Sequence, residues 1–586
     1  MALFEFDKAK DKERYLLGQV REVDTRKVSV LVDNDKDLRK ARVNQLIAIA
    51  MADGTDTWLI GLIDKVIKSV VQLSTSLEPE NDEDETEDED TLPKEAVVNT
   101  VKLTLMGTAR WNNLNQKPDF SRSLNHVPEI DAECYVLKDA NLEAFMGILS
   151  SSTEKAHALD LGVFTLDEKA TAFLDGNKLF QRHAALLGST GSGKSWTVAS
   201  VLERSAKLRS SNLVVFDLHG EYKNLSYARQ LRIPGPDELK NEDDGVLYLP
   251  YWMLNTEELQ SMFIDSTEFS AHNQVMAFQD IVVEEKKKTL SLLQKHDVLA
   301  AFTLDSPIPF DIKNVIAKIT HLNEEMVQGA RGLKQGAFYG QFSRLLLRLN
   351  SKLNDRRYGF MFQAPDTAND YDALAAFAEK LAGFTDTNSQ IKIIDFSEVP
   401  SDILPVVIGL VARLLYQIQF WTNHEQRRPI ALVCDEAHLY LPRGQMNPVE
   451  KRAVEAFEKI AKEGRKYGVA LMIVSQRPSD VSETVLSQCN NVIALRLTNG
   501  DDQNTVKKML PESLESLLEA LPVMDVGEAL VVGDSVLLPS RIKIHPPADK
   551  PLSATVDFWS RWQESVAAPD FIRIIENMRR QSRREP

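Results

Sequence analysis

The segment Gly188–Ser195 reads GSTGSGKS and fits the spacing G-x-x-x-x-G-K-[ST]. Glycines at these positions let successive backbone N–H groups close around phosphate oxygens, and a helix that begins here adds its positive N-terminus. Lys194 would neutralise phosphate oxygens, and Ser195 would bind Mg²⁺. A glycine-rich turn without a ligand is the alternative, but apolar HAALL precedes the segment and the helical pattern WTVASVLERSAKL follows it. The sequence therefore predicts a nucleotide-phosphate site made of Gly188, Ser189, Thr190, Gly191, Ser192, Gly193, Lys194 and Ser195.

Two adjacent carboxylates follow an apolar run further along the chain. The run is PIALVC, and Asp435 and Glu436 come directly after it. At a strand end beside a phosphate loop, Asp435 could hold Mg²⁺ through water, and Glu436 could orient and deprotonate an attacking water. An acidic pair after a strand can also begin a helix, where the helix dipole favours negative charge. The predicted phosphate loop in the same sheet favours the catalytic interpretation.

A third apolar run, NLVVF, ends in the polar stretch DLHGEY. In a parallel α/β sheet its C-terminal end lies at the same edge as the phosphate loop. Asp217 and Glu221 are therefore candidate acids that organise metal or water, and an Asx-turn built by Asp217 before Gly220 is the alternative. Gln476, at the end of ALMIVSQ, could sense the γ-phosphate or could be a turn residue. We expect His438 to pack beside the site.

Arg465 stands directly before that last run, in the stretch KEGRKYGVALMIVSQ. The preceding pattern, NPVEKRAVEAFEKIAKEG, is helical, so Arg465 and Lys466 could be cations near a helix C-terminus. Alternatively, Arg465 is an arginine finger, which stabilises charge on the transferring phosphoryl group and can come from a neighbouring subunit. The second interpretation requires an oligomer.

The elements that must position these residues predict several domains. Short alternating runs separated by turns in the first part of the chain predict a small N-terminal β-barrel. Strand and helix patterns then alternate, which predicts an α/β core with a mainly parallel sheet, and long helical stretches interrupt it. The expected domains are a barrel at 1–150, two parts of a nucleotide-binding core at 151–254 and 381–545, a helical insertion at 255–380 and a C-terminal arm at 546–586.

The net charge of −17 would ordinarily argue against nucleic-acid binding, because phosphate backbones attract cationic surfaces. Ten of the carboxylates, however, lie between Glu78 and Asp90 in the run EPENDEDETEDED, which contains no base. By composition this run is a solvated loop at about 78–92, or else an acidic decoy that occupies a basic groove. The charge of the remaining chain is therefore much closer to neutral.

No window approaches eighteen uninterrupted apolar residues, and the stretch MALFEFDKAKDKERYLLGQV carries charges where a signal peptide would be apolar. We expect a cytoplasmic protein that does not act at a membrane. Its cysteines include no C-x-x-C pair, which argues against a disulfide framework and a zinc site; they are Cys134, Cys434 and Cys489.

Taken in order, the motifs resemble the HerA branch of the HerA/FtsK family of hexameric P-loop ATPases. The resemblance extends over most of the chain and rests on RHAALLGSTGSGKS, VVFDLHGEY, NDRRYGFMF, VCDEAHLYLP, EGRKYGVALMIVSQRPS and GEALVVGDSVLLPSRIKIHPP. It implies a RecA-like core, ATP with Mg²⁺, and a homohexameric ring. It also implies that Arg465 acts in trans and that Arg182 reaches a neighbour's nucleotide. The acidic run is not a feature expected of the family.

Members of this family are typically DNA translocases that act with a partner enzyme, often a nuclease, and some relatives work beside sirtuin-type or other effectors in phage defence. The resemblance thus implies double-stranded DNA in a central channel and an effector docked on the barrel side. Candidate channel residues, each of which could equally belong to a solvated basic face, are Arg331, Lys334, Arg443, Lys451 and Arg452. We expect an ATP-driven translocase or helicase; the rival is an ATP-gated ring scaffold that activates an effector without translocating.

Overall fold

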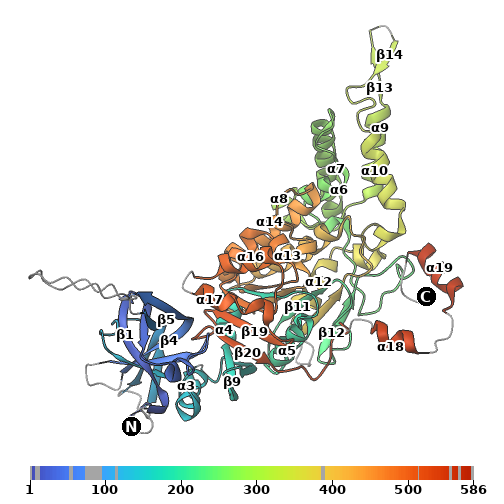
Figure 1. The fold of residues 1–586 in the computed structure, drawn as a ribbon. Helices are drawn as coiled ribbons and strands as arrows, with labels where there is room; N and C mark the ends of the chain where they lie inside the picture. Colours follow the sequence, from blue (N-terminus) through green and yellow to red (C-terminus); the bar gives the residue numbers. More distant parts are fainter. Residues whose placement is uncertain are drawn as a thin grey trace, which may run out of the picture. The chain divides into compact units, whose positions relative to one another are not determined.

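The computed structural model describes residues 3–4, 6, 13–51, 57–72, 95–112, 117–152, 154–330, 332–383, 390–511, 514–553, 557–564 and 569–581. The chain forms two compact units (Figure 1). Unit 1 comprises Met1–Asn177 and Thr498–His545, and unit 2 comprises Lys178–Leu497 and Pro546–Pro586. The acidic run at 78–90 and the candidate Arg331 lie outside the described residues.

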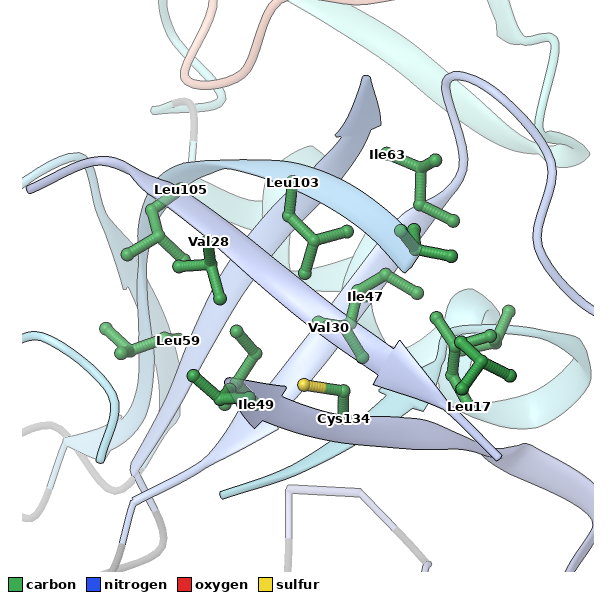
Figure 2. Close-up of a cluster of buried hydrophobic side chains, with 14 residues drawn as sticks. Leu17, Val28, Val30, Ile47, Ile49, Leu59, Ile63, Leu103, Leu105 and Cys134 are labelled. Carbon is green, nitrogen blue, oxygen red and sulfur yellow. The ribbon is translucent and has the colours of Figure 1, made fainter. Parts of the chain in front are cut away.

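Unit 1 contains the closed β-barrel that the alternating runs predict. Its antiparallel strands follow the order β2-β1-β7-β3-β4-β5, β2 pairs with β5 to close the barrel, and β6 pairs with β5. Alternation places apolar side chains on the inner face, where Val28, Val30, Leu103, Leu105 and Cys134 are at most 1% exposed (Figure 2). The bounds are β1 (Leu16–Asp24), β2 (Lys27–Val32), α2 (Asp35–Leu38), β3 (Leu46–Ala50), β4 (Thr57–Gln72), β5 (Glu95–Asn112), β6 (Lys117–Ser121) and β7 (Glu133–Val136).

The two longest barrel strands, β4 and β5, pair as a ribbon from Thr57↔Arg110 to Gln72↔Glu95. Toward the Gln72 end the ribbon exposes a group of valines: Val66, Val70, Val71 and Val97. Val70 and Val97 are paired directly across the two strands, so they form an exposed apolar pair on one face of the ribbon.

The rest of unit 1 is a second, antiparallel set of strands in the order β19-β20-β8-β9. The sequence-based division assigned these strands to the nucleotide-binding core, and that assignment stays a prediction. The bounds are α3 (Asp139–Ser152), β8 (Ala158–Phe164), β9 (Asp167–Asp175), α16 (Gly500–Met509), α17 (Glu515–Leu518), β19 (Glu528–Gly533) and β20 (Ser540–Ile544).

Unit 2 is built on a parallel sheet in the order β12-β15-β11-β16-β17-β10-β18. Every residue of β10, β11, β15, β16, β17 and β18 is buried, as expected for a parallel sheet covered by helices on both faces. The bounds are α4 (Gly176–Gln181), β10 (Ala184–Leu187), β11 (Leu213–Asp217), β12 (Ala228–Arg232), β15 (Ile391–Asp395), β16 (Ile430–Cys434), β17 (Val469–Ser475) and β18 (Asn491–Ala494).

Helices α5 (Lys194–Ala206), α13 (Leu404–Trp421), α14 (Pro448–Glu463) and α15 (Glu483–Ser487) accompany this sheet. α13 is long and apolar enough to cross a membrane, but 67% of its apolar window is buried inside the protein, as in the core helix of a folded domain. α13 packs closely against α14, because a Cβ at Gly409 of α13 would lie only 3.0 Å from the Ala453 Cα of α14.

The stretch between β12 and β15 is the predicted helical insertion, with one difference. A two-stranded antiparallel hairpin, β13 (Met326–Gly329) and β14 (Gly332–Gln335), joins α9 to α10, and Figure 1 shows it at the far end of these two helices. The helices are α6 (Thr256–Phe263), α7 (Ala271–Leu292), α8 (His296–Ala301), α9 (Ile312–Glu324), α10 (Ser343–Asn354), α11 (Gly359–Phe362) and α12 (Ala373–Ala382), and the C-terminal arm carries α18 (Phe558–Gln563) and α19 (Phe571–Arg580).

Candidate nucleotide site

The loop from Gly188 to Gly193 joins β10 to α5, as the motif predicts. Gly191 (φ 74°) and Gly193 (φ 100°) adopt the left-handed backbone conformation that favours glycine. Gly188 has a different reason to be glycine, because a Cβ there would lie 2.5 Å from the Ser192 Oγ. The thirteen-residue helix α5 follows the turn directly. This is the geometry of a phosphate-binding loop.

Lys194, Asp435 and Glu436 meet at the mouth of this loop. The Lys194 Nζ lies 2.5 Å from the Glu436 Oε1 and 3.8 Å from the Asp435 Oδ1, and all three side chains are at most 8% exposed. β16 ends at Cys434, so both carboxylates leave the C-terminal edge of the sheet, two strands from the phosphate loop. The motifs predicted from separate parts of the sequence therefore form one buried, charged cluster.

The backbone at Glu436 is strained. Its φ of 46° and ψ of 43° are left-handed, which is uncommon for a residue with a side chain and recurs at functional sites. Among the described residues the Glu436 Oε2 accepts no hydrogen bond, and the nearest ionisable partner is the His438 Nδ1 at 3.4 Å. One carboxylate oxygen is thus held by Lys194, and the other is buried without a hydrogen-bond partner among the described residues.

Burial controls the protonation of the carboxylates. It raises the pKa of Asp435 to about 7, against the opposing effect of Lys194, and the negative charges of Glu436, Glu221 and Asp217 add to the increase. Burial also raises the pKa of Asp217 and lowers the pKa of His438. Several acids share one lysine here, so an added cation would be strongly favoured.

These residues fit a magnesium ion bound with nucleotide. Mg²⁺ usually keeps several waters and takes only one or two protein oxygens beside the substrate phosphates. Asp435 supplies oxygen at the cluster, Ser195 follows Lys194 at the start of α5, and the acid-rich surroundings favour a divalent cation. Within the described ranges, no group of three or more His, Cys, Asp or Glu side chains is placed to hold a metal by itself. The donor set therefore suits a metal that arrives with phosphate.

Gln476 reaches the phosphate loop. Its Oε1 accepts a hydrogen bond of 2.6 Å from the Thr190 Oγ1, although the two residues are 286 positions apart in the sequence. The residue before it, Ser475, has its Oγ 3.3 Å from the His438 Nδ1. The end of β17 thus contacts both the phosphate loop and the side chain next to Glu436, which is where a γ-phosphate sensor would lie.

The Asp217 side chain forms the turn after β11 that the sequence offered as one of its two roles. The Oδ1 accepts the backbone N–H groups of His219, Gly220 and Glu221 at 3.3, 2.8 and 3.0 Å, and the Oδ2 accepts that of Tyr222 at 3.0 Å. Both oxygens are therefore used to fold the segment after β11. Glu221 is half-buried in that segment and close enough to raise the pKa of Asp435.

The two candidate trans-acting arginines lie at the N-terminal ends of their strands, whereas the phosphate loop lies at the C-terminal ends. Arg465 is exposed in the turn η5 (Gly464–Tyr467) before β17, and half-buried Arg182 precedes β10. β17 has seven residues, so at about 3.3 Å per residue its ends are roughly 20 Å apart. That distance exceeds the reach of an arginine, so Arg465 does not serve the phosphate loop of its own chain. The position of Arg465 agrees both with a cation at the C-terminal end of α14 and with a residue that enters the nucleotide site of a neighbouring subunit.

The candidate channel residues are mostly paired with carboxylates. The Arg443 guanidinium lies 2.7 Å from Glu483, and that of Arg452 lies 2.6 Å from Glu257. Lys451 lies 4.0 Å from Glu455. Lys334, in contrast, is exposed on β14, and no ion pair with another described residue involves it. Neighbouring carboxylates therefore offset the positive charge of three of the candidates.

One functional contact was not foreseen from the sequence. The Tyr222 hydroxyl donates a 3.1 Å hydrogen bond to the Asp435 Oδ2. The two residues are 213 positions apart, so no local pattern could indicate the contact. The only signal was the place of this tyrosine at the end of DLHGEY.

Comparison with known proteins assigns the family. The model "Helicase HerA, central domain" matches residues 159–415, and "Helicase HerA-like C-terminal" matches residues 407–545. The DNA double-strand break repair helicase HerA of Pyrococcus furiosus is 26% identical over 77% of this chain and 78% of its own length. Its namesake in Saccharolobus solfataricus is 26% identical, covering 66% and 68% of the two chains. A bacterial conjugative coupling protein, TrwB, covers 70% of this chain and 93% of its own with 14% identity and a TM-score of 0.44. With both domain models spanning most of its length, the chain belongs to the HerA family and is a P-loop ATPase with a RecA-like core.

Proposed function

We propose that this ATPase is a homohexameric motor that uses ATP and Mg²⁺ to move along double-stranded DNA in the cytoplasm. The observation that carries the proposal is the buried cluster of Lys194, Asp435 and Glu436 at the phosphate loop, in a chain whose relatives are named DNA repair helicases. The cluster explains hydrolysis, and the relatives' names support DNA as the track.

Hydrolysis follows from the groups in the cluster. The phosphates of ATP compete with Glu436 for the Lys194 ammonium, and this competition releases the Oε1 oxygen of Glu436. Glu436 then accepts the proton of a water whose oxygen attacks the γ-phosphorus, and ADP is the leaving group. Bound Mg²⁺ would neutralise charge on the β- and γ-phosphate oxygens, held by Asp435 and Ser195. Gln476, hydrogen-bonded to Thr190, is placed to respond when the γ-phosphate departs.

The hexamer is supported by the position of the arginines. Arg465 and Arg182 lie at the sheet edge away from their own phosphate loop, so they can stabilise phosphoryl transfer only at a neighbour's site. A ring in which each subunit completes the next site meets that requirement. It would also couple hydrolysis in one subunit to movement of the next.

DNA contact requires positive charge on only part of the ring. In our proposal the β13–β14 hairpin, with exposed Lys334, contributes to the DNA-binding channel. The ion-paired residues Arg443, Lys451 and Arg452 contribute less, because their charges already have partners.

The barrel docks a partner in this proposal, either a nuclease or a sirtuin-type or other effector, in DNA end processing or phage defence. The exposed valines of the β4–β5 ribbon support a protein-binding role for this side of unit 1. A scaffold that activates the effector without moving on DNA is the second candidate, and the same ribbon supports it equally.

The test is the ATPase rate of the purified protein with and without linear duplex DNA, together with its mass in solution. A hexamer whose ATPase rate rises several-fold with DNA is the expected result. A hexamer that ignores DNA but responds to a co-purifying protein would favour the scaffold, and a monomer with full ATPase activity would contradict the ring.

A further inference from the structure

Tyr222 is a fully buried side chain whose only polar atom meets the catalytic cluster. Its exposed fraction is 0%, and its hydroxyl donates to the Asp435 Oδ2 at 3.1 Å. The contact therefore bears directly on the carboxylate that is placed to hold the metal.

The backbone around Tyr222 is fixed from several sides. The Asp217 carboxylate accepts its N–H at 3.0 Å, and the Gln230 side chain donates to its carbonyl oxygen at 3.2 Å. From the C-terminal segment, the Leu552 N–H donates to the carbonyl of Glu221 at 2.7 Å. The tyrosine ring is thus held by main-chain bonds on both sides of it, and its hydroxyl has little freedom to move.

The other oxygen of Asp435 is fixed as well. Its Oδ1 accepts the backbone N–H of Glu436 at 2.9 Å and lies 3.8 Å from the Lys194 Nζ. With Tyr222 on Oδ2, each oxygen has one defined donor and keeps a free lone pair. A carboxylate held this way presents its remaining lone pairs in one direction before any ligand binds, which lowers the entropy cost of binding.

We propose that Tyr222 is a positioning residue for the Asp435 carboxylate, and that Asp217 serves the ATPase by folding the turn that places Tyr222. The proposal assigns the end of the DLHGEY stretch to the metal site, although none of its side chains need touch the metal. It rests on the ATPase activity and not on movement along DNA. All measurements can therefore be made without DNA.

The test is Tyr222→Phe, which keeps the ring and removes the hydroxyl. We expect the affinity for Mn²⁺, used as a spectroscopic stand-in for Mg²⁺ and measured by electron paramagnetic resonance in the presence of ADP, to fall about tenfold. The concentration of Mg²⁺ that gives half-maximal ATPase should rise similarly, while a fluorescent ADP analogue in EDTA should bind as tightly as to the unchanged protein. A loss of metal affinity with unchanged metal-free nucleotide binding distinguishes mispositioning of the metal ligand from a general loss of structure.

Tyr227→Phe is the matched control, since the Tyr227 hydroxyl also makes one hydrogen bond, of 3.1 Å, but to the Ala199 carbonyl on α5. It should leave Mn²⁺ affinity unchanged. Equal Mn²⁺ affinities in the Tyr222→Phe variant and the unchanged protein would overturn the proposal, and so would an equal loss in both phenylalanine variants.

Asp217→Asn tests the second half of the proposal and remains informative should Tyr222→Phe fail to fold. Its amide oxygen can still accept the three N–H groups that meet Oδ1, but its amide nitrogen cannot accept the N–H of Tyr222. Mn²⁺ affinity should therefore fall, and adding Tyr222→Phe should lower it little further. An Asp217→Asn protein that folds and binds Mn²⁺ normally would contradict the proposal that Asp217 acts through Tyr222. Fully additive losses of Mn²⁺ affinity in the double variant would contradict it as well.

Discussion

Lys194 and Glu436 form a buried ion pair in which the ammonium nitrogen lies 2.5 Å from the carboxylate oxygen. The lysine that must neutralise ATP phosphates therefore already has an anionic partner. In the proposed mechanism, nucleotide binding exchanges that partner for phosphate, which couples occupancy of the loop to the freedom of the proposed base, Glu436. A carboxylate on a strained, left-handed residue is well suited to such an exchange, because its position is set by the fold and not by local preference.

Glu436→Gln should keep ATP binding and lose hydrolysis. The amide cannot accept a proton from water, so the single-turnover rate should fall about a hundredfold or more, while Lys194 no longer pairs with a carboxylate and should bind phosphate at least as tightly. Rapid-quench hydrolysis and a fluorescent ATP analogue measure the two effects. Glu458→Gln, at an exposed ion pair with Lys462, is the control and should change neither. Normal turnover by the Glu436→Gln variant would remove Glu436 from the role of base.

Gln476→Ala should lower the ATPase kcat about tenfold with little effect on nucleotide affinity. The reason is that Gln476 contacts Thr190 of the phosphate loop and does not hold the purine ring of the nucleotide. Thr190→Val, which removes the donor of the same hydrogen bond, should lower kcat as well. Steady-state kinetics on the single and double variants measure their coupling. Fully additive losses would mean that the Thr190–Gln476 contact has no catalytic role.

Arg465→Ala should be complemented in mixed rings. Neither Arg465→Ala nor Glu436→Gln should hydrolyse ATP efficiently alone, but a mixture contains interfaces with an intact arginine on one subunit and an intact base on the next. Part of the ATPase activity should therefore return on mixing. Lys459→Ala, on the exposed side of α14, is the control and should remain active alone. No recovery at any mixing ratio, with mixed rings verified by mass, would count against a finger supplied in trans.

Lys334→Glu should weaken DNA binding more than Arg443→Glu, because Arg443 is already paired with Glu483 and Lys334 has no carboxylate partner among the described residues. Removing one phosphate contact per subunit should also reduce the salt dependence of binding. Fluorescence anisotropy with labelled duplex at several salt concentrations measures both. Basal ATPase without DNA is the internal control and should stay unchanged. If the Arg443→Glu variant were the weaker binder, the hairpin would not be the main DNA contact.

The chemistry of the site could be predicted from the sequence because it depends on short, local patterns. The loop Gly188–Ser195 requires glycines and a lysine at fixed spacing, and Asp435 and Glu436 follow a strand whose burial is visible as an apolar run. The barrel and the parallel sheet were predictable for the same reason, since alternating runs and continuous apolar runs report directly which faces are buried.

The tertiary structure decided what depends on distant residues. Four backbone N–H groups, which only the folded segment brings to its carboxylate, show that Asp217 folds a turn. The partners of Gln476 and Tyr222 are more than two hundred positions away, and the carboxylates of Glu483 and Glu257, which pair with Arg443 and Arg452, come from α15 and α6. Local patterns carry no information on such contacts, because each one is fixed by how the strands are ordered in the sheet and by how the helices pack on it.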